Sequence, residues 1–328
     1  MAESVQNLKK RLKSIGNINK ITKAMELVAA TKMRKSQEIA LASRPYAFTA
    51  LDLLANLTRL ETGGGRASTQ LPELLKRRKV KKVLLVLVAS DKGLAGAFNS
   101  SVFKKFESFL KQNSQKYQDE KIFVAVGEKS ANYLSRKGLN VVKKFTHVGD
   151  FTTVEQVQPI TDFLVQGYLE KNWDKVVVFS THFRSALKQE SLTREVLPIG
   201  FESIKETVKE IIPDKGKFAE LIKEQSISFI NNETVAAQSV GMSKEYLIEP
   251  SAKAVLEDLV KHLFFMQLYH LILEANASEH AARRLAMKTA SDNAKDLGQA
   301  LNLQYNKVRQ ASITNQIIEI IAGSEALN

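Results

Sequence analysis

The positions of proline and glycine constrain the fold of this chain more than any other feature of its sequence. The chain has 328 residues and six prolines, and all six lie between Pro45 and Pro250. Between residues 251 and 321 the only glycine is Gly298. Proline breaks a helix interior, and a glycine there costs ~1 kcal/mol relative to alanine. Both ends of the chain can therefore remain helical over long stretches.

The first segment, from about Ser4 to Ser43, has apolar residues at steps of three and four, the spacing of one face of a helix. These residues are Val5, Leu8, Leu12, Ile15, Ile18, Ile21, Met25 and Val28. Asn19 lies on the same side and makes the stripe imperfect. A helix of about forty residues would extend ~60 Å.

The last segment begins at Pro250, and proline is well tolerated at a helix start. Its apolar positions are Leu256, Leu259, Leu263, Met266, Leu273 and Ala277, and then, less regularly, Leu285, Leu297, Leu301 and Val308. A helix that runs from there to Gly323 would be ~105 Å long and needs a partner along its length. We therefore expect the two terminal helices to pair as a long antiparallel, left-handed coiled coil.

The middle of the chain has a different pattern. Residues 83–88, 122–126 and 176–179 are continuous apolar runs, typical of strands buried on both faces. Helical stretches lie between them, near 98–116, 128–137 and 153–172. This alternation predicts a small parallel-type α/β domain inserted between the terminal helices.

These patterns divide the chain into five predicted regions. They are an N-terminal coiled-coil helix (1–60), a linker that ends in the basic run Lys76–Lys82 (61–82), an α/β domain (83–200), an extended loop or helix segment (201–247) and a C-terminal coiled-coil helix (248–328).

Motifs for chemistry are scarce. The chain has no cysteine, which excludes disulfides and zinc thiolate sites. The turn at residues 90–99 follows a strand and contains glycine, but it matches neither common phosphate-binding pattern, so a tight strand-to-helix turn is the simpler interpretation. The five histidines have no metal-binding spacing, and no catalytic constellation is evident. No run is long and apolar enough to span a bilayer.

Charge and hydrophobicity are unevenly distributed. Residues 1–44 contain ten Lys or Arg and three Glu, a net charge of +7, whereas residues 251–321 are close to neutral. This basic helix is either an ordinary solvated face or a surface for an acidic partner. Near the C-terminus, Ile313, Ile317, Ile318, Ile320 and Ile321 surround much of the helix, which predicts that it is buried. Antiparallel pairing favours burial against another protein over packing against the chain's own domain.

Four stretches, at residues 11–34, 90–99, 277–294 and 305–314, together resemble the gamma subunit of bacterial-type rotary (F-type) ATP synthases. Residues 11–34 look like that family's opening helix, and residues 90–99 look like its central turn. Residues 277–294 and 305–314 are similar to its C-terminal helix. The resemblance covers roughly residues 1–200 and 245–328.

The resemblance implies a function and a set of partners. The terminal helices would form a central-stalk rotor inside a hexamer of alpha and beta subunits, and the α/β domain would form a foot touching the epsilon subunit and the ring of c subunits. Rotation of that ring, driven by protons or sodium, would cycle the catalytic sites of the hexamer. The chain itself would hold no nucleotide, cofactor or metal. It would lie peripherally at the cytoplasmic face of the bacterial cell membrane.

The resemblance also implies contact residues. Lys23, Met25 and Lys32 match the family's N-terminal helix where it meets the beta subunits. Positions that bond to loops of the hexamer are matched by Arg283, Arg309, Gln310 and Thr314. The apolar bearing at the tip would consist of Ile317, Ile318, Ile320 and Ile321.

Two alternatives come from other functional classes. A basic coiled-coil adaptor would bind nucleic acid through residues 1–44 and 76–82, although no aromatic residues interleave with these charges. An α/β enzyme with helical arms would need a catalytic constellation that the sequence does not show.

Overall fold

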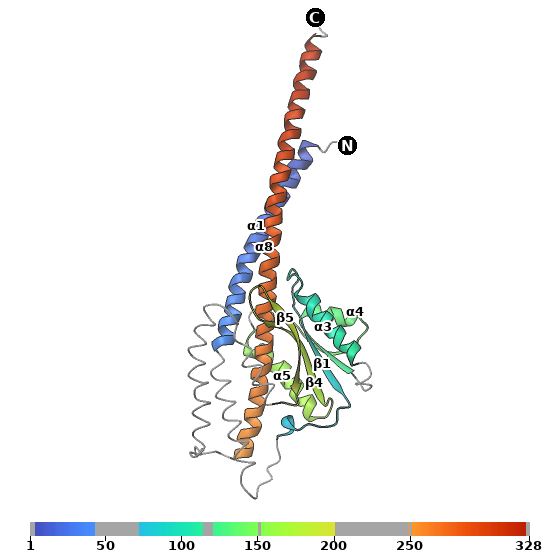
Figure 1. Cartoon of the computed structure of the whole chain (residues 1–328), viewed down its shortest axis with the longest axis vertical. Helices are drawn as coiled ribbons and strands as arrows, with labels where there is room; N and C mark the ends of the chain where they lie inside the picture. Colours follow the sequence, from blue (N-terminus) through green and yellow to red (C-terminus); the bar gives the residue numbers. More distant parts are fainter. Residues whose placement is uncertain are drawn as a thin grey trace. The chain divides into compact units, whose positions relative to one another are not determined.

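A five-stranded sheet and two long helices account for most of the structure. The computed structural model describes residues 4–42, 72–113, 121–149, 152–200, 249 and 251–325 (Figure 1). The chain divides into two units. Met1–Ala30 with Arg283–Asn328 is called here the two-helix unit, and Thr31–Ala282 is called the sheet unit. The predicted segment 201–247 and residues 43–60 of the predicted N-terminal region lie outside the described residues.

The two terminal helices confirm the prediction from proline and glycine. Helix α1 comprises Val5–Ala42 and helix α8 comprises Ala252–Glu325, a single helix of 74 residues. Each helix passes from one unit into the other along the chain. The Ser251 hydroxyl accepts a hydrogen bond from the Ala254 N–H at 3.2 Å, which satisfies one of the free donors at the start of α8.

The sheet has the strand order β3-β2-β1-β4-β5. Strands β1 (Val83–Val88), β2 (Lys121–Val126), β3 (Val141–Phe145) and β4 (Lys175–Phe183) are parallel to their neighbours. Strand β5 (Gln189–Leu197) pairs antiparallel with β4. The parallel core was predicted, but β3 and β5 were not. Both are sheet-edge strands with mostly exposed or half-buried residues, so they lack the continuous apolar run of a central strand.

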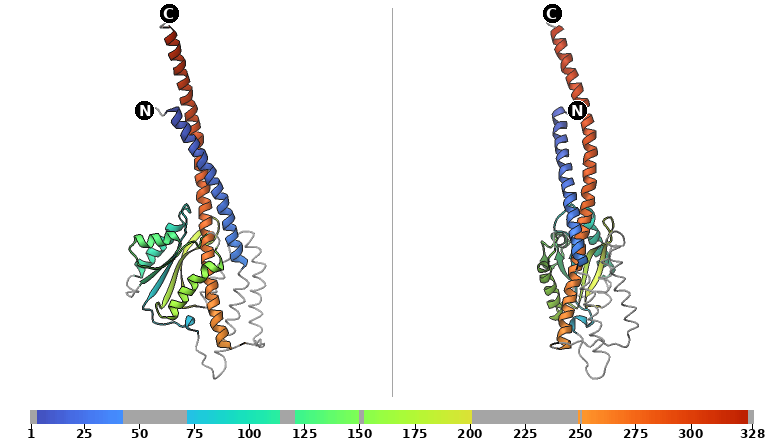
Figure 2. Two further views of the ribbon diagram at one scale, coloured as in Figure 1. Left: turned by 180° about the vertical axis from the view of Figure 1, so that it is seen from behind. Right: turned by 90° about the vertical axis from the view of Figure 1, so that its left-hand side faces the viewer.

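Helices cover both faces of this sheet. Helices α3 (Phe98–Gln112) and α4 (Glu128–Arg136) pack on the odd-numbered side chains of β1, such as Leu85 and Leu87. Helix α5 (Val154–Leu169) and residues 256–275 of α8 pack on the even-numbered ones, such as Leu84 and Val86 (Figures 1 and 2). Alternate residues of one strand therefore belong to two separate cores.

The residues before β1 are attached to this domain. A short 3₁₀ helix, η1 (Glu73–Leu75), buries Leu74 in the core of α5 and α8. The Arg78 guanidinium forms an ion pair with Asp174 at 2.8 Å and lies 4.1 Å from the centre of the Tyr168 ring. The backbone N–H groups of Lys81 and Lys82 donate to the same Asp174 carboxylate at 2.9 and 3.0 Å. The basic run at the end of the predicted linker is thus partly fixed to the sheet unit.

The turn after β1 is closed by its own side chains. The Ser90 N–H donates to Asn99 Oδ1 at 3.1 Å, and the Ser90 hydroxyl donates to the Lys92 carbonyl at 2.7 Å. Gly127, in the neighbouring turn after β2, has φ +94° and approaches Ala89 so closely that a Cβ would lie 2.0 Å from its carbonyl oxygen. This geometry matches the tight-turn interpretation of residues 90–99.

Candidate functional site: the two-helix unit

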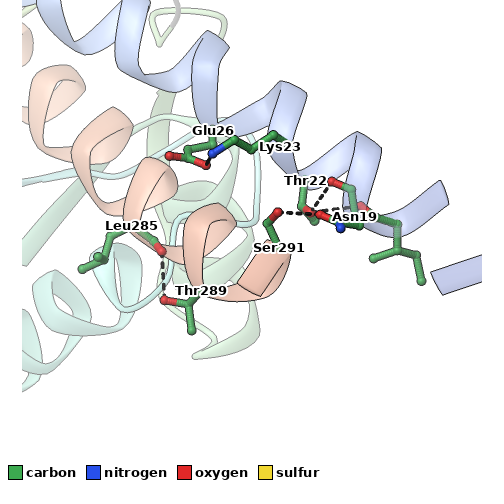
Figure 3. Close-up of polar contacts among 8 residues, drawn as sticks. Asn19, Thr22, Lys23, Glu26, Leu285, Thr289 and Ser291 are labelled. Atoms are coloured by element: carbon green, nitrogen blue, oxygen red, sulfur yellow. Dashed lines mark hydrogen bonds and ion pairs between the residues drawn. The ribbon is translucent and has the colours of Figure 1, made fainter. Parts of the chain in front are cut away.

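Helices α1 and α8 pair antiparallel in the two-helix unit. The Ser291 hydroxyl donates to Asn19 Oδ1 at 2.6 Å (Figure 3). Gly298 faces Ile15, whose Cγ2 lies 3.7 Å from the position of a Cβ built on that glycine. Residue numbers rise along α1 while they fall along α8, so the helices run in opposite directions. The predicted antiparallel pairing is confirmed within this unit.

The buried stripe of α1 differs from the predicted one. It follows alternating steps of four and three, as in a coiled coil. Its members in this unit are Leu8, Leu12, Ile15, Asn19, Thr22, Glu26 and Ala29. Ile18, Ile21 and Val28 were predicted to face α8, but their side chains are 50%, 59% and 54% exposed. The prediction went wrong after Ile15, where it took two successive steps of three and so left the heptad spacing.

The stripe of α8 also corrects the prediction. The inward positions of this helix are Arg283, Met287, Ser291, Ala294, Gly298, Leu301, Tyr305 and Val308. Leu285 and Leu297 were predicted to belong to the stripe, but both are exposed. Small side chains at Ser291, Ala294 and Gly298 occupy the middle of this stripe, and its inward positions between Met287 and Leu301 hold no large apolar residue.

Polar residues in the middle of the interface satisfy one another locally. The Thr22 hydroxyl lies within hydrogen-bonding distance of the Ile18 and Asn19 carbonyl oxygens, at 3.0 and 3.1 Å. Glu26, which is buried, forms an ion pair with Lys23 at 2.9 Å (Figure 3). Asn19, which the sequence marked as a flaw in the stripe, is therefore an interfacial residue with a partner on α8.

The outward face of α1 combines apolar and basic side chains. Four large apolar side chains, those of Ile18, Ile21, Leu27 and Val28, are about half exposed or more. Within the two-helix unit, the exposed lysines of this helix are Lys9, Lys10, Lys13, Lys20 and Lys23. The sequence prediction did not identify the apolar residues of this face as surface residues. The constant alternation of four and three from Leu8 onward was the signal that would have identified them.

Three predicted contact residues lie on α1. Lys23 is exposed apart from its ion pair with Glu26, and Met25 is half-buried. Lys32 is also half-buried, and it belongs to the sheet unit. These positions are compatible with contact to a partner protein, and their roles remain predictions.

The predicted contact residues of α8 fall into two groups. Arg283 is buried at the start of the two-helix unit. Arg309, Gln310 and Thr314 are all exposed, and Thr314 lies one turn after the adjacent pair Arg309 and Gln310. The Arg309 guanidinium lies 5.9 Å from the centre of the Tyr305 ring, and the Thr314 hydroxyl donates to the Gln310 carbonyl at 2.9 Å. The structure thus brings three of the four to one short surface of α8.

The isoleucines near the end of α8 are all exposed. Ile317, Ile318, Ile320 and Ile321 have exposed fractions between 51% and 72%, and Ile313 is 47% exposed. Large apolar side chains gathered at a surface mark contact sites. This arrangement is compatible with an apolar bearing, which remains a prediction.

Two kinds of feature are absent from the described residues. None of the helices in the described ranges is long and apolar enough to cross a membrane. No group of three or more His, Asp or Glu side chains within those ranges is placed to hold a metal ion.

Comparison with known proteins identifies the family. The family model described as ATP synthase matches residues 4–327. A curated protein of Herpetosiphon aurantiacus, an ATP synthase gamma chain, is 35% identical, and the alignment covers 99% of each chain. The chain belongs to the ATP synthase gamma chain family. Another gamma chain, from Chlorobaculum parvum, is 33% identical with 99% of each chain covered. The expected gamma subunit of an F-type ATP synthase is thereby confirmed.

Solved structures support the same fold for this gamma-family chain. A chain of the Euglena gracilis mitochondrial ATP synthase, determined with OSCP, F1 and c-ring, has a TM-score of 0.58 at 15% identity, with 98% of this chain and 94% of that chain covered. A chain of the central stalk and c-ring of the Tetrahymena thermophila enzyme has a TM-score of 0.53 at 22% identity, covering 83% of this chain and 99% of that chain. At these identities the likeness shows the fold alone.

Proposed function

We propose that this chain is the non-catalytic rotor of an F-type ATP synthase, turning inside a hexamer of alpha and beta subunits. Its rotation would couple ion flow through a c-subunit ring to ATP synthesis or hydrolysis in the hexamer. The family match supports the assignment to the complex. The non-catalytic role rests on the lack of a nucleotide-binding or catalytic motif in the sequence.

The distribution of side chains in the two-helix unit is the observation that carries the proposal. Asn19, Thr22 and Glu26 face the interface, whereas Ile18, Ile21 and Val28 face outward. An isolated coiled coil stabilises itself with the opposite arrangement. Outward apolar residues among lysines suit a shaft that a larger, acidic protein surrounds.

The proposed contacts follow the surface of this unit. Lys23, Met25 and the outward apolar residues of α1 would meet the beta subunits. Arg309, Gln310 and Thr314 would meet loops of the hexamer, and Ile317, Ile318, Ile320 and Ile321 would form the bearing at the tip. Apolar side chains suit a bearing because their attraction is non-directional, so rotation breaks no fixed hydrogen bond.

The remaining partners belong to the sheet unit in this proposal. The related structures contain a c-ring together with F1 or the central stalk. We propose that the sheet unit of this chain binds the c-ring and the epsilon subunit. The complex would then hold the chain peripherally at the cytoplasmic face of the bacterial membrane.

The nucleic-acid alternative loses part of its proposed surface. It required the basic run 76–82 to be available to phosphates, yet Arg78 is engaged by Asp174, Tyr168 and Trp173 within the sheet unit. A phosphate-binding arginine must present its guanidinium to the ligand. The arrangement of Arg78 therefore favours a structural role for this residue.

Purification from the native source tests the proposal. A chain tagged within residues 201–247 is isolated under gentle conditions and assayed for bound proteins, ATPase activity and nucleic acid. We expect two larger subunits in hexameric stoichiometry, with ATPase activity. Recovery of nucleic acid, or of the chain alone, would contradict the proposal.

A further inference from the structure

The part of α8 inside the sheet unit contains polar side chains where an apolar face would suffice for packing. Residues 267–281 are all buried, and they include Glu274, Asn276 and Ser278. Burying a polar group is unfavourable unless it is hydrogen-bonded. The partners of these side chains come from one loop and one strand of the sheet unit.

The loop between β3 and α5 supplies the first set of partners. The Asn276 side-chain amide donates to the Val148 carbonyl at 3.1 Å and also to the Thr152 hydroxyl. The Thr152 hydroxyl donates in turn to the Val148 carbonyl at 2.8 Å. Two turns earlier on α8, the Tyr269 hydroxyl donates to the Thr152 carbonyl at 3.2 Å. Asn276 and Tyr269 thus hold one loop at two points along the helix.

Strand β4 supplies the second set. His182 Nδ1 lies 2.9 Å from Glu274 Oε2, and both side chains are more than nine-tenths buried. The Ser278 hydroxyl lies 3.5 Å from the Thr181 carbonyl. Neither His182 Nε2 nor Glu274 Oε1 has a hydrogen-bond partner in the described structure. A buried pair with unsatisfied atoms is a poor source of stability, so stability does not explain it.

Both sets lie at the carboxyl edge of the parallel strands. In open α/β sheets this edge is where ligands bind, beside the point where the strand order reverses. Here the reversal lies between β1 and β4. A Cβ built on Gly149, in the loop after β3, would lie 3.2 Å from Asp91 Oδ2 and 3.7 Å from Glu279 Oε2. Side chains of α8 therefore fill part of the ligand-binding edge.

We propose that Asn276, Tyr269 and the His182–Glu274 pair form a lock that fixes the rotation of α8 about its own axis against the α/β domain. Apolar packing is non-directional and permits a helix to turn or slide by small steps. Hydrogen bonds are directional, and those from α8 to the β3–α5 loop and to strand β4 oppose such turning. These are positioning residues, and this inference rests on the proposed rotor function.

The lock has a mechanical consequence. The same helix continues beyond the sheet unit to Glu325, so torque applied to the α/β domain must enter α8 through the contacts in the sheet unit. When the lock is removed, α8 would rotate about its own axis relative to the α/β domain whenever torque is applied. Slippage would appear as ATP hydrolysis without ion transport, while the chain would still fold and assemble.

The test uses the complete ATP synthase in membrane vesicles. Asn276→Leu keeps the branching and the number of heavy atoms of the side chain and removes both of its donated bonds, and Thr152 still donates to the Val148 carbonyl. A second variant, His182→Phe with Glu274→Leu, replaces the buried pair by apolar side chains, a change that often leaves stability intact. Leu271→Ala on the same buried helix is the matched control, because it weakens packing and leaves the lock in place.

The readout is ATP hydrolysis that continues against a maximal opposing ion gradient. We expect this uncoupled hydrolysis to rise about fivefold for each hydrogen bond removed, the ratio that a typical bond contributes to an equilibrium. Leu271→Ala should lower the Tm of the full chain and leave uncoupled hydrolysis unchanged. The proposal would be overturned if uncoupled hydrolysis did not change in either lock variant. It would also be overturned if uncoupled hydrolysis rose equally in Leu271→Ala. If the unmodified chain itself failed to couple hydrolysis to transport, the rotor function and the lock would both fall.

Discussion

Helix α8 passes through two different environments, and the contrast shows how one helix can serve two tasks. Residues 267–281, inside the sheet unit, are buried on every side. Residues 283–312, in the two-helix unit, are mostly exposed and are buried or half-buried mainly at every third or fourth position. Residues 313–324 are exposed throughout. The first stretch is suited to fixed attachment, and the second leaves most of its surface available to a partner.

The polar residues of the two stretches differ in the same way. In the sheet unit, Asn276 and Tyr269 bond to backbone carbonyls of another element. In the two-helix unit, Thr22 bonds to its own helix, and the Asn19–Ser291 bond joins two side chains across the helices. Buried polar contacts specify one arrangement when several elements share them. The sheet unit should therefore tolerate added side-chain volume poorly, and the two-helix unit should tolerate it better.

A pair of glycine substitutions gives the largest expected contrast. Gly167 and Gly298 both lie within helices, so alanine brings the same gain in helix propensity. A Cβ at Gly167 would lie 2.0 Å from the Trp173 ring, which is buried. Gly167→Ala should destabilise the chain by about 3 kcal/mol. Gly298→Ala meets only ordinary contact with Ile15 at 3.7 Å and should stabilise it by about 0.5 to 1 kcal/mol. Denaturant unfolding of the full chain measures both, and equal effects would contradict the contrast.

Leucine truncations test the corrected interface of the two-helix unit. Leu301 is 4% exposed, whereas Leu297, one turn earlier, is 48% exposed. Leu301→Ala should cost about 2 to 3 kcal/mol in the unfolding of this unit, because it leaves a cavity between the helices. Leu297→Ala should change it by less than about 0.5 kcal/mol. Circular dichroism during thermal unfolding measures both variants. Equal losses would restore the stripe predicted from the sequence, which contained both leucines.

The bond between the helices should have a smaller effect. Ser291→Ala removes the donor to Asn19 Oδ1 and should lower the free energy of unfolding by about 1 kcal/mol. Ser100→Ala is the control, since that exposed hydroxyl bonds only to the Ala97 carbonyl at 2.9 Å within its own helix. A loss at position 291 no larger than that at position 100 would mean that the bond does not hold the helices together.

The smallest effect concerns pH and is specific to the sheet unit. Burial raises the pKa of Asp174, but the N–H groups of Lys81 and Lys82 and the charge of Arg78 outweigh it, so the pKa lies below its ordinary 3.8. A lowered carboxyl pKa stabilises the folded state above the unfolded pKa, and that stability is lost as pH falls through the folded value. The stability difference between the chain and Asp174→Asn should therefore be full above about pH 4 and shrink below it. Urea unfolding at several pH values measures this, and a constant difference would contradict it.

The sequence predicted the elements whose own residues carry a clear local pattern. It missed the elements whose conformation depends on pairing with another strand. The absence of proline after Pro250 was enough to predict α8, and the apolar run of residues 83–88 was enough to predict β1. Strand β5 is half-buried, and its pairing with β4 gives it its conformation, so no local pattern indicated it.

The site was predictable in part for the same reason. Arg309, Gln310 and Thr314 came from family resemblance, and the structure places them together on α8. Ile18 and Ile21 were placed on the wrong face, because apolar residues were assumed to mark the interface. In this chain, Asn19 and Thr22 occupy the interface instead. The His182–Glu274 pair joins residues 92 positions apart, and no sequence spacing reveals it.

Direct observation of rotation tests the rotor function most simply. The chain has no cysteine, so Ser135→Cys, on the exposed side of α4, gives a single site for a bead. The alpha and beta subunits of the native complex, with their own cysteines removed, are fixed to a surface and joined to this chain. We predict that the bead turns in one direction when ATP is added and stops when ATP is withdrawn. A bead that stays still while the assembled complex hydrolyses ATP would contradict the rotor function.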